Sequence, residues 1–150
     1  MSGYADTSFV VSLYVPDVHS RAAIATISRV REPLLITGFV EVELCNALKL
    51  RRFRKDLTAA QVKAAAQAFE QDRQTGIFSL QALPFAAFEK AKVLARQHTA
   101  LLGTRSLDLI HVASALTLGA SGFFSLDRTQ RKLAHAAGLS LRPKTRSPNL

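Results

Sequence analysis

Short apolar runs and segments with helical spacing alternate along the whole chain. Residues 34–37 form a continuous apolar run after Pro33, as is typical of a strand that is buried on both faces of a parallel sheet. Residues 77–83 instead alternate between apolar and polar side chains, which also predicts a strand. We expect strands in the residues before Asp6 and at 34–37, 77–83, 123–125 and 139–141.

Between these runs, apolar residues recur every three or four positions, which predicts helices. Pro16 stops the first of them, Thr58 caps the fourth and Gly138 closes the last. Helices are expected at 7–15, 20–30, 38–52, 59–75, 84–99, 107–118 and 127–137. Strands that alternate with helices predict one α/β domain with a mainly parallel sheet, over residues 1–141. Residues 142–150 are basic and contain prolines, and we expect a flexible tail there.

The charge of the chain indicates a class of partner. Twenty Lys and Arg residues against eleven Asp and Glu residues give a net charge of +9, which favours a polyanionic partner such as nucleic acid, an acidic protein segment or a membrane surface. No apolar stretch is long enough for a membrane span and no signal peptide is visible, so we expect a cytoplasmic protein with no membrane partner. The single cysteine, Cys45, cannot form an internal disulfide and is expected to be a small core residue in a reducing compartment.

The positive charge is densest at residues 49–55, where five cations surround one phenylalanine. Such a run is typical of a solvated helix end, but it also suits a surface that contacts phosphates, and the two interpretations are compatible. The residues just before Asp108 and just after Asp127 add one arginine each. The candidate phosphate contacts, each of which could equally be plain surface charge, are Lys49, Arg51, Arg52, Arg54, Lys55, Arg105 and Arg128.

Four of the few acids, Asp6, Glu43, Asp108 and Asp127, lie at or near junctions where a strand or turn leads into a helix. Each has a structural explanation by itself, because acids cap helices and favour their first turns. In a parallel sheet, however, such junctions gather at one edge, so the four carboxylates could converge. Clustered carboxylates repel one another unless a cation lies among them, and hard divalent cations prefer oxygen ligands. Together with the basic surface, this favours metal-dependent chemistry on a phosphodiester.

Two of these acids have informative neighbours. Asp108 is flanked by apolar residues, and an unpaired carboxylate would be costly to bury there. His111, one turn later, is expected to pack beside Asp108 or to bond to it. Glu43 shares a helix face with Ala47, a small residue that leaves room around the carboxylate, whereas Glu41 projects elsewhere and is expected at the surface.

Four segments that carry these acids resemble the four motifs of the PIN-domain ribonucleases, and within them the VapC-type toxins of type II toxin–antitoxin systems. They occur in the order and spacing of the family, over residues 4 to about 138. The segments are Ala5-Asp6-Thr7-Ser8, Glu43-Leu44-Cys45-Asn46-Ala47-Leu48, Ser106-Leu107-Asp108-Leu109-Ile110-His111-Val112-Ala113-Ser114-Ala115 and Phe124-Ser125-Leu126-Asp127-Arg128-Thr129-Gln130.

This resemblance implies a PIN-like fold, with helices on both faces of the sheet, and an endoribonuclease that depends on Mg²⁺ or Mn²⁺. It implies that Asp6, Glu43 and Asp108 bind the metal and act in catalysis, with Asp127 as a fourth and more variable acid. The supporting polar positions it implies are Thr7, Ser8 and Ser125. It further implies an RNA substrate, a cognate antitoxin that blocks the acidic pocket, and a homodimer. A non-catalytic RNA- or protein-binding module with the same fold is the alternative, and the presence of all four acids argues against it.

Overall fold

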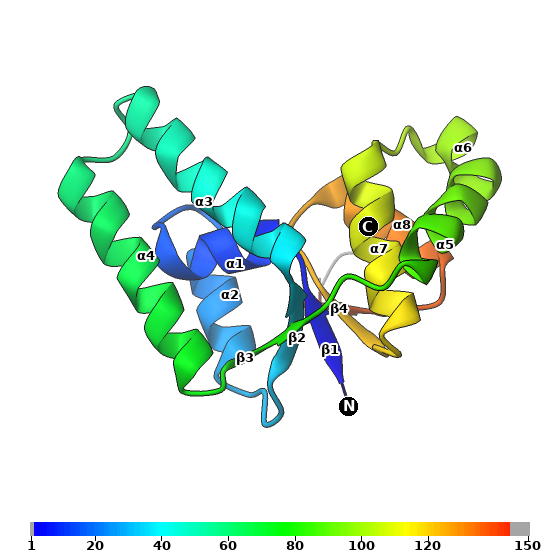
Figure 1. The fold of residues 1–150 in the computed structure, drawn as a ribbon, viewed down its shortest axis with the longest axis horizontal. Coiled ribbons are helices and arrows are strands. Elements are labelled where there is room, and N and C mark those ends of the chain that lie inside the picture. Colours follow the sequence, from blue (N-terminus) through cyan, green and yellow to red (C-terminus); the bar gives the residue numbers. More distant parts are fainter. Residues whose placement is uncertain (1, 145–150) are drawn as a thin grey trace.

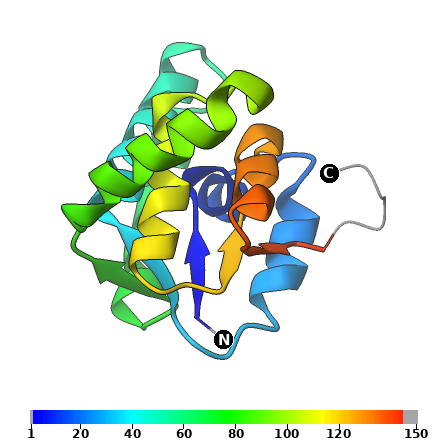
Figure 2. The same cartoon turned by 90° about the vertical axis from the view of Figure 1, so that its right-hand side faces the viewer.

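The computed structural model describes residues 2–144, which form a five-stranded parallel sheet between two layers of helices (Figure 1). The strand order is β3-β2-β1-β4-β5, and every neighbouring pair is parallel. Figure 2 shows β3 and β5 at opposite edges of this sheet. The strands are β1 (Gly3–Ala5), β2 (Leu34–Thr37), β3 (Phe78–Gln81), β4 (Gly122–Phe124) and β5 (Ser140–Arg142). The predicted fold class is confirmed.

One helical layer precedes β3 in the sequence and the other follows it (Figure 1). The first contains α1 (Thr7–Tyr14), α2 (Ser20–Ile27), α3 (Gly38–Phe53) and α4 (Ala59–Gln74). The second contains α5 (Ala86–Leu94), the π-helical turn η1 (Ala95–Thr99), α6 (Ala100–Leu102), α7 (Ser106–Thr117) and α8 (Arg128–Ala136). Because β1, β2 and β4 run in the same direction, their carboxyl ends lie on the same side of the sheet. The starts of α1, α3 and the β4–α8 turn therefore lie on that side too.

The core is densest where the central strand β1 meets its neighbours. Tyr4 of β1 is fully buried, and its ring stacks on that of Phe123 of β4 with 5.9 Å between centroids. Gly3 is required beside them, because a Cβ there would lie 2.3 Å from the Phe124 ring. This close packing fixes the position at which β1 ends and the site begins.

Several element ends differ from the sequence-based expectations. The helix predicted at 20–30 ends at Ile27, and Val30 packs on the core from the turn that follows. The helix predicted at 84–99 is α5 followed by the π-helical turn η1, and Gly103 ends α6 with φ of 66°. At the predicted tail, Arg142 belongs to β5, and residues 145–150 lie outside the described residues. No helix within residues 2–144 combines the length and apolar character that a membrane span needs.

Candidate active site

The strand order reverses between β1 and β4, and this is where open α/β sheets bind ligands, outside the carboxyl ends of the strands. Asp6 follows β1 directly, and Ser125 follows β4 directly. The two turns are joined, because the Asp6 backbone N–H donates to the Phe124 carbonyl at 3.0 Å. The topology therefore brings together residues that lie about 120 positions apart in the sequence.

Asp6 caps α1 and is also a buried carboxylate. One oxygen, Oδ1, accepts from the Phe9 backbone N–H at 3.0 Å and from the Ser8 hydroxyl at 2.7 Å. The other, Oδ2, is buried without a hydrogen-bond donor from the described residues. Helix capping therefore accounts for the contacts of Oδ1 only, and Oδ2 can bind another ligand.

Ser8 ties the β1–α1 turn to the β4–α8 turn. Its hydroxyl donates to Asp6 and accepts from the backbone N–H groups of Leu126 and Asp127 at 2.9 and 3.1 Å. The Ser125 hydroxyl, which is buried, accepts from the Asp127 N–H as well. These two serines therefore set the position of Asp127, whose own Oδ1 caps α8 through the Gln130 N–H.

Asp108 lies in the first turn of α7 and is fully buried. Its Oδ2 accepts from the Arg105 backbone N–H at 2.8 Å, and the Arg105 guanidinium lies 3.5 Å from the same oxygen. That guanidinium also lies 3.8 Å from Asp127 Oδ2, so one exposed arginine spans two of the predicted acids. Asp108 Oδ1 is buried with no hydrogen-bond donor in the described part of the chain.

Glu43, on α3, is held from the opposite layer. Its Oε1 accepts from the Thr7 hydroxyl at 2.6 Å and from His111 Nε2 at 2.5 Å. His111 Nδ1 lies 3.0 Å from the Tyr4 hydroxyl, and both rings are fully buried. The expected bond from His111 to Asp108 is therefore wrong, because from its place on α7 the ring reaches Glu43 of α3 instead.

The pKa values of Asp6 and Glu43 shift in opposite directions. Burial raises the pKa of Asp6, and the nearby His111 and Ser125 together with the hydrogen bonds from Phe9 and Ser8 offset this only in part. Burial would also raise the pKa of Glu43, but its hydrogen bond from His111 and its other interactions together lower it. Asp6 is thus the acid whose charge most needs a partner, whereas that of Glu43 already has one.

The donor set fits a small, hard cation that keeps much of its own water. Asp6 and Asp108 each present one buried carboxylate oxygen that lacks a donor among the described residues, and a buried charge of this kind is stabilised by a bound metal. Within residues 2–144 no three Asp, Glu, His or Cys side chains are grouped closely enough to hold one ion. Mg²⁺ characteristically takes one or two carboxylates, with waters and phosphate oxygens completing its shell. The residues present therefore fit such an ion, although not an all-protein cage.

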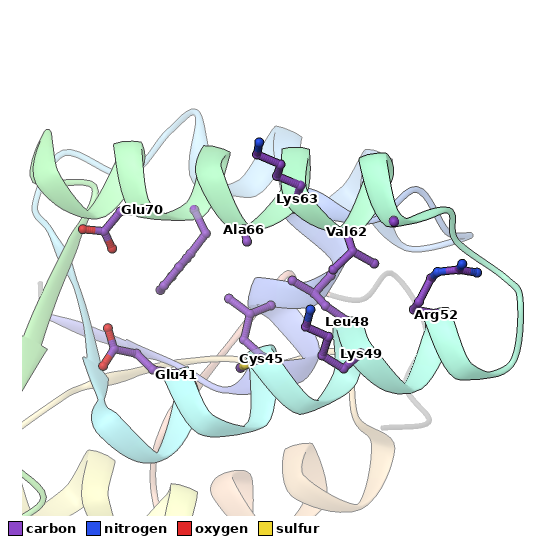
Figure 3. Close-up of a pocket in the computed structure, with 12 residues that line it drawn as sticks. Glu41, Cys45, Leu48, Lys49, Arg52, Val62, Lys63, Ala66 and Glu70 are labelled. Carbon is purple, nitrogen blue, oxygen red and sulfur yellow. The ribbon is translucent and has the colours of Figure 1, made fainter.

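The cations of the basic run do not share one surface. Lys49 and Arg52 line a groove of about 670 Å³ between α3 and α4, with Leu48 and Val62 inside it (Figure 3). Cys45 lies in this groove and is exposed, so the expectation that it is a core residue is wrong. The helix turns Leu44 inward, and its neighbour Cys45 faces α4 instead.

The rest of the run lies elsewhere. Arg51 lines a separate hollow beside Asp127, and Arg54 and Lys55 are exposed at the end of α3. Arg128, at the start of α8, is exposed too.

Sequence reasoning missed two residues near the site. Tyr4 reads as an ordinary apolar strand residue, and only its hydroxyl contact with His111 reveals its role. Arg131 reads as a surface cation of α8, yet it is buried and donates to the carbonyls of Ser125, Arg142 and Pro143. No signal in the sequence distinguishes Arg131 from the exposed arginines, because its partners are backbone groups.

Comparison with known families agrees with this geometry. The family model of the PIN domain matches residues 4–136, which include all four acids. The chain belongs to the PIN-domain family. The comparison with curated protein sequences gives no significant match.

Three solved structures illustrate the similarity of fold. VapC20 of Mycobacterium tuberculosis, described as a toxin that cleaves the sarcin–ricin loop, aligns with a TM-score of 0.70 and 18% identity, over 95% of this chain and 100% of that one. FitAcB of Neisseria gonorrhoeae aligns with a TM-score of 0.69 and 14% identity, over 93% of this chain and 95% of that one. VapBC2 of Rickettsia felis, bound to promoter DNA, aligns with a TM-score of 0.64 and 15% identity, over 95% of this chain and 98% of that one. At these identities the likeness shows a shared fold.

Proposed function

We propose that this PIN-domain protein is a metal-dependent endoribonuclease that acts as the toxin of a toxin–antitoxin pair. The observation that carries the proposal is the pair of buried carboxylate oxygens, on Asp6 and Asp108 at the switch point of the sheet, to which no residue of the described range 2–144 donates. Similarity of fold to VapC20, a toxin that cleaves an RNA loop, supports RNA as the substrate. The net charge of +9 supports it as well.

The roles of the side chains follow from their contacts. Asp6 and Asp108 would hold Mg²⁺ or Mn²⁺ through their free oxygens, and Glu43 and Asp127 would complete the acidic site directly or through water. A metal bound there would lower the pKa of a bound water and polarise the scissile phosphate. Arg105, already beside Asp108 and Asp127, can offset the charge that develops on the phosphate. Thr7, Ser8 and Ser125 hold the carboxylates and turns in place.

Cleavage of total cellular RNA by the purified protein tests the nuclease proposal. With Mg²⁺ or Mn²⁺ we expect discrete fragments that chelator abolishes, and no fragments from Asp6→Asn or Asp108→Asn. Each substitution removes a metal-binding charge with almost no change of shape, so circular dichroism should show an intact fold. Cleavage by either variant at the wild-type rate would contradict the proposed site.

The toxin role has its own test in living cells. Induced expression of the wild-type protein should arrest growth, and expression of Asp6→Asn should not. Co-expression of the product of an adjacent small reading frame, which we expect to encode the antitoxin, should restore growth. Unchanged growth on induction of the wild-type protein would count against a toxin while leaving the nuclease proposal intact.

The groove between α3 and α4 is the surface that we assign to the antitoxin. Apolar side chains line its floor, Lys49, Arg52 and Lys63 lie along its walls, and Glu41 and Glu70 lie together at one end (Figure 3). This suits an amphipathic segment that carries acidic residues at one end. We also propose that the protein forms a homodimer.

A further inference from the structure

The basic run 49–55 is divided by the geometry of α3, and the division separates Arg51 from its neighbours. Successive residues of a helix are rotated by about 100°. Lys49 and Arg52 consequently line the groove toward α4, whereas Arg51 lines a hollow on the side of α1 and the β4–α8 turn. Adjacent arginines of one helix thus face two different surfaces.

The hollow beside Arg51 is continuous with the acidic site. It has a volume of about 330 Å³, at the lower end of the range for ligand pockets. Three of its lining residues belong to the site or contact it: Thr7 bonds to Glu43, Ser8 bonds to Asp6, and Asp127 is itself one of the four acids. A molecule bound at the acids would therefore extend into this hollow.

Arg51 is the arginine that lines the hollow. The residue is half-buried, and its side chain has no hydrogen bond or ion pair with any residue in the described range 2–144. The hollow's second acid, Asp17, is occupied: its carboxylate accepts from the Ser12 hydroxyl at 2.9 Å and from the His19 backbone N–H at 2.7 Å. An arginine that lines a recess without pairing to a carboxylate of the described residues can receive an anion from outside.

The position of Arg51 along α3 indicates which anion. Glu43, Ala47 and Arg51 follow one another at intervals of four residues, so they lie along one stripe of the helix. Eight residues correspond to about 12 Å of helix rise. Arg51 is thus too far along the helix to share the phosphate that the acids and their metal would hold, and it is placed for another phosphate of the same strand.

We propose that the hollow lined by Thr7, Ala47, Arg51 and Asp127 binds an unpaired nucleotide that flanks the scissile bond of RNA, with Arg51 contacting its phosphate. This inference rests on the proposed nuclease function and adds a substrate subsite to it. A recess of this size accepts a single nucleotide and excludes a duplex, and sequence-specific proteins commonly bind RNA through unpaired nucleotides. Arg51 serves binding, and the chemistry stays with the acids.

The test compares Arg51→Gln with its neighbour Arg52→Gln. The two variants lose the same charge from adjacent positions of the same helix. They differ in the surface that loses it, which is the hollow for Arg51 and the groove toward α4 for Arg52. Binding of a fluorescein-labelled single-stranded RNA of mixed sequence is measured by anisotropy in chelator at several salt concentrations, and Mn²⁺ affinity is measured by calorimetry. Michaelis constants and turnover numbers come from the RNA cleavage assay.

We expect Arg51→Gln to weaken RNA binding about fivefold to tenfold and to reduce the slope of log affinity against log salt by about 0.7, as for one lost phosphate contact with a single strand. The Michaelis constant should rise while the turnover number and Mn²⁺ affinity stay within twofold of wild type. Arg52→Gln, whose side chain lines the groove toward α4, should weaken RNA binding less than Arg51→Gln does. Ala47→Leu, which fills the hollow without changing the charge, should also weaken RNA binding and leave Mn²⁺ affinity unchanged.

Equal losses of RNA affinity in Arg51→Gln and Arg52→Gln would overturn the subsite, because a general charge effect would then explain both. Wild-type RNA affinity in Ala47→Leu would overturn it too. Both outcomes concern the variants, whereas the nuclease proposal is tested by cleavage with the wild-type protein. Failure of the subsite can therefore be distinguished from failure of the nuclease proposal. A wild-type protein that neither binds nor cleaves RNA would overturn both proposals together.

Discussion

Asp6 combines two demands on one side chain. Its Oδ1 satisfies the first turn of α1 and accepts from Ser8, while its Oδ2 is buried with no donor from the described residues. Burial raises the pKa of this carboxyl group. A helix cap alone would need neither the burial nor the free oxygen, since Asn and Ser cap equally well. Without a metal, the ionised side chain therefore lowers the stability of the fold.

The sign of this effect gives a testable pH dependence. A carboxyl group whose pKa is higher in the folded state contributes stability below its unfolded pKa, and that contribution is lost as pH rises through the folded pKa. In chelator, the free energy of unfolding of the wild-type protein should therefore contain a component that falls as pH rises from acid to neutral. Asp6→Asn, which keeps a capping group and removes the charge, should lack this component.

At neutral pH in chelator we thus expect Asp6→Asn to unfold at a higher urea concentration than wild type, by on the order of 1 kcal/mol in free energy. Added Mn²⁺ should reverse the order, because it stabilises only the form that binds it. Urea titrations at pH 5 and 7, with chelator and with Mn²⁺, measure all four cases. A variant that is less stable than wild type in chelator at pH 7 would contradict the assigned cost of the buried charge.

At the scale of elements, the parallel sheet is what made the site predictable from the sequence. Strands and helices alternate clearly enough to place all four acids at element junctions, and the parallel sheet then brings these junctions to one edge. Contacts within and next to each turn, such as the cap by Asp6, follow from local rules as well. The positions of Asp6 and Asp127 relative to their helices could therefore be read from the sequence.

Contacts between the two layers could not be predicted in the same way. Whether His111 bonds to Asp108 or to Glu43 depends on how α7 is rotated against the sheet. Sequence spacing shows only that Asp108 and His111 share one face of α7. The same limit hid the contact of the Tyr4 hydroxyl with His111, which lies 107 positions away. Arg131 was missed because its partners are backbone carbonyls. The assignment of Cys45 failed for a related reason, since α4 leaves an open groove beside it.

His111 joins α7 to α3, and we predict that this contact positions Glu43 for the metal. Partners that orient a metal-binding group typically change metal affinity by 10- to 100-fold when they are removed. His111→Leu should therefore weaken Mn²⁺ binding by about tenfold or more. His111→Gln, whose amide can replace the Nε2 donor, should recover part of this loss, and Tyr4→Phe should cause a smaller one. Calorimetric titration with Mn²⁺ measures each variant.

The matched control is His135→Gln, which alters an exposed histidine of α8 and should bind Mn²⁺ as wild type does. Thermal melts in chelator identify any variant that fails to fold. If His111→Leu fails to fold, Tyr4→Phe still tests the contact. Equal Mn²⁺ affinity in the Leu and Gln variants would argue that His111 fills space without positioning Glu43.

At the scale of the whole molecule, exposed apolar side chains are distributed unevenly. Phe85 and Phe88 lie 6.1 Å apart between ring centroids, with Phe85 82% exposed. A hollow of about 350 Å³ between α5 and α7 continues from Phe88 along the small side chains of Ala91 and Ala95. Phe53 is also 82% exposed, but it lies among the cations at the end of α3, with Leu50 as the nearest exposed apolar residue along the helix. A contiguous apolar surface indicates an interface, whereas a single exposed side chain does not.

We therefore predict that the proposed homodimer forms through the surface of Phe85 and Phe88. Most homodimers are two-fold symmetric, so one substitution alters the interface twice and should be strongly disruptive. Phe85→Glu should sediment as a monomer at micromolar concentration, where wild type and Phe53→Glu sediment as dimers. The three proteins should bind Mn²⁺ equally, because both phenylalanines are exposed at the surface, whereas Asp6 and Asp108 are buried. A wild-type monomer would exclude the homodimer, and dissociation by Phe53→Glu alone would move the interface to the end of α3.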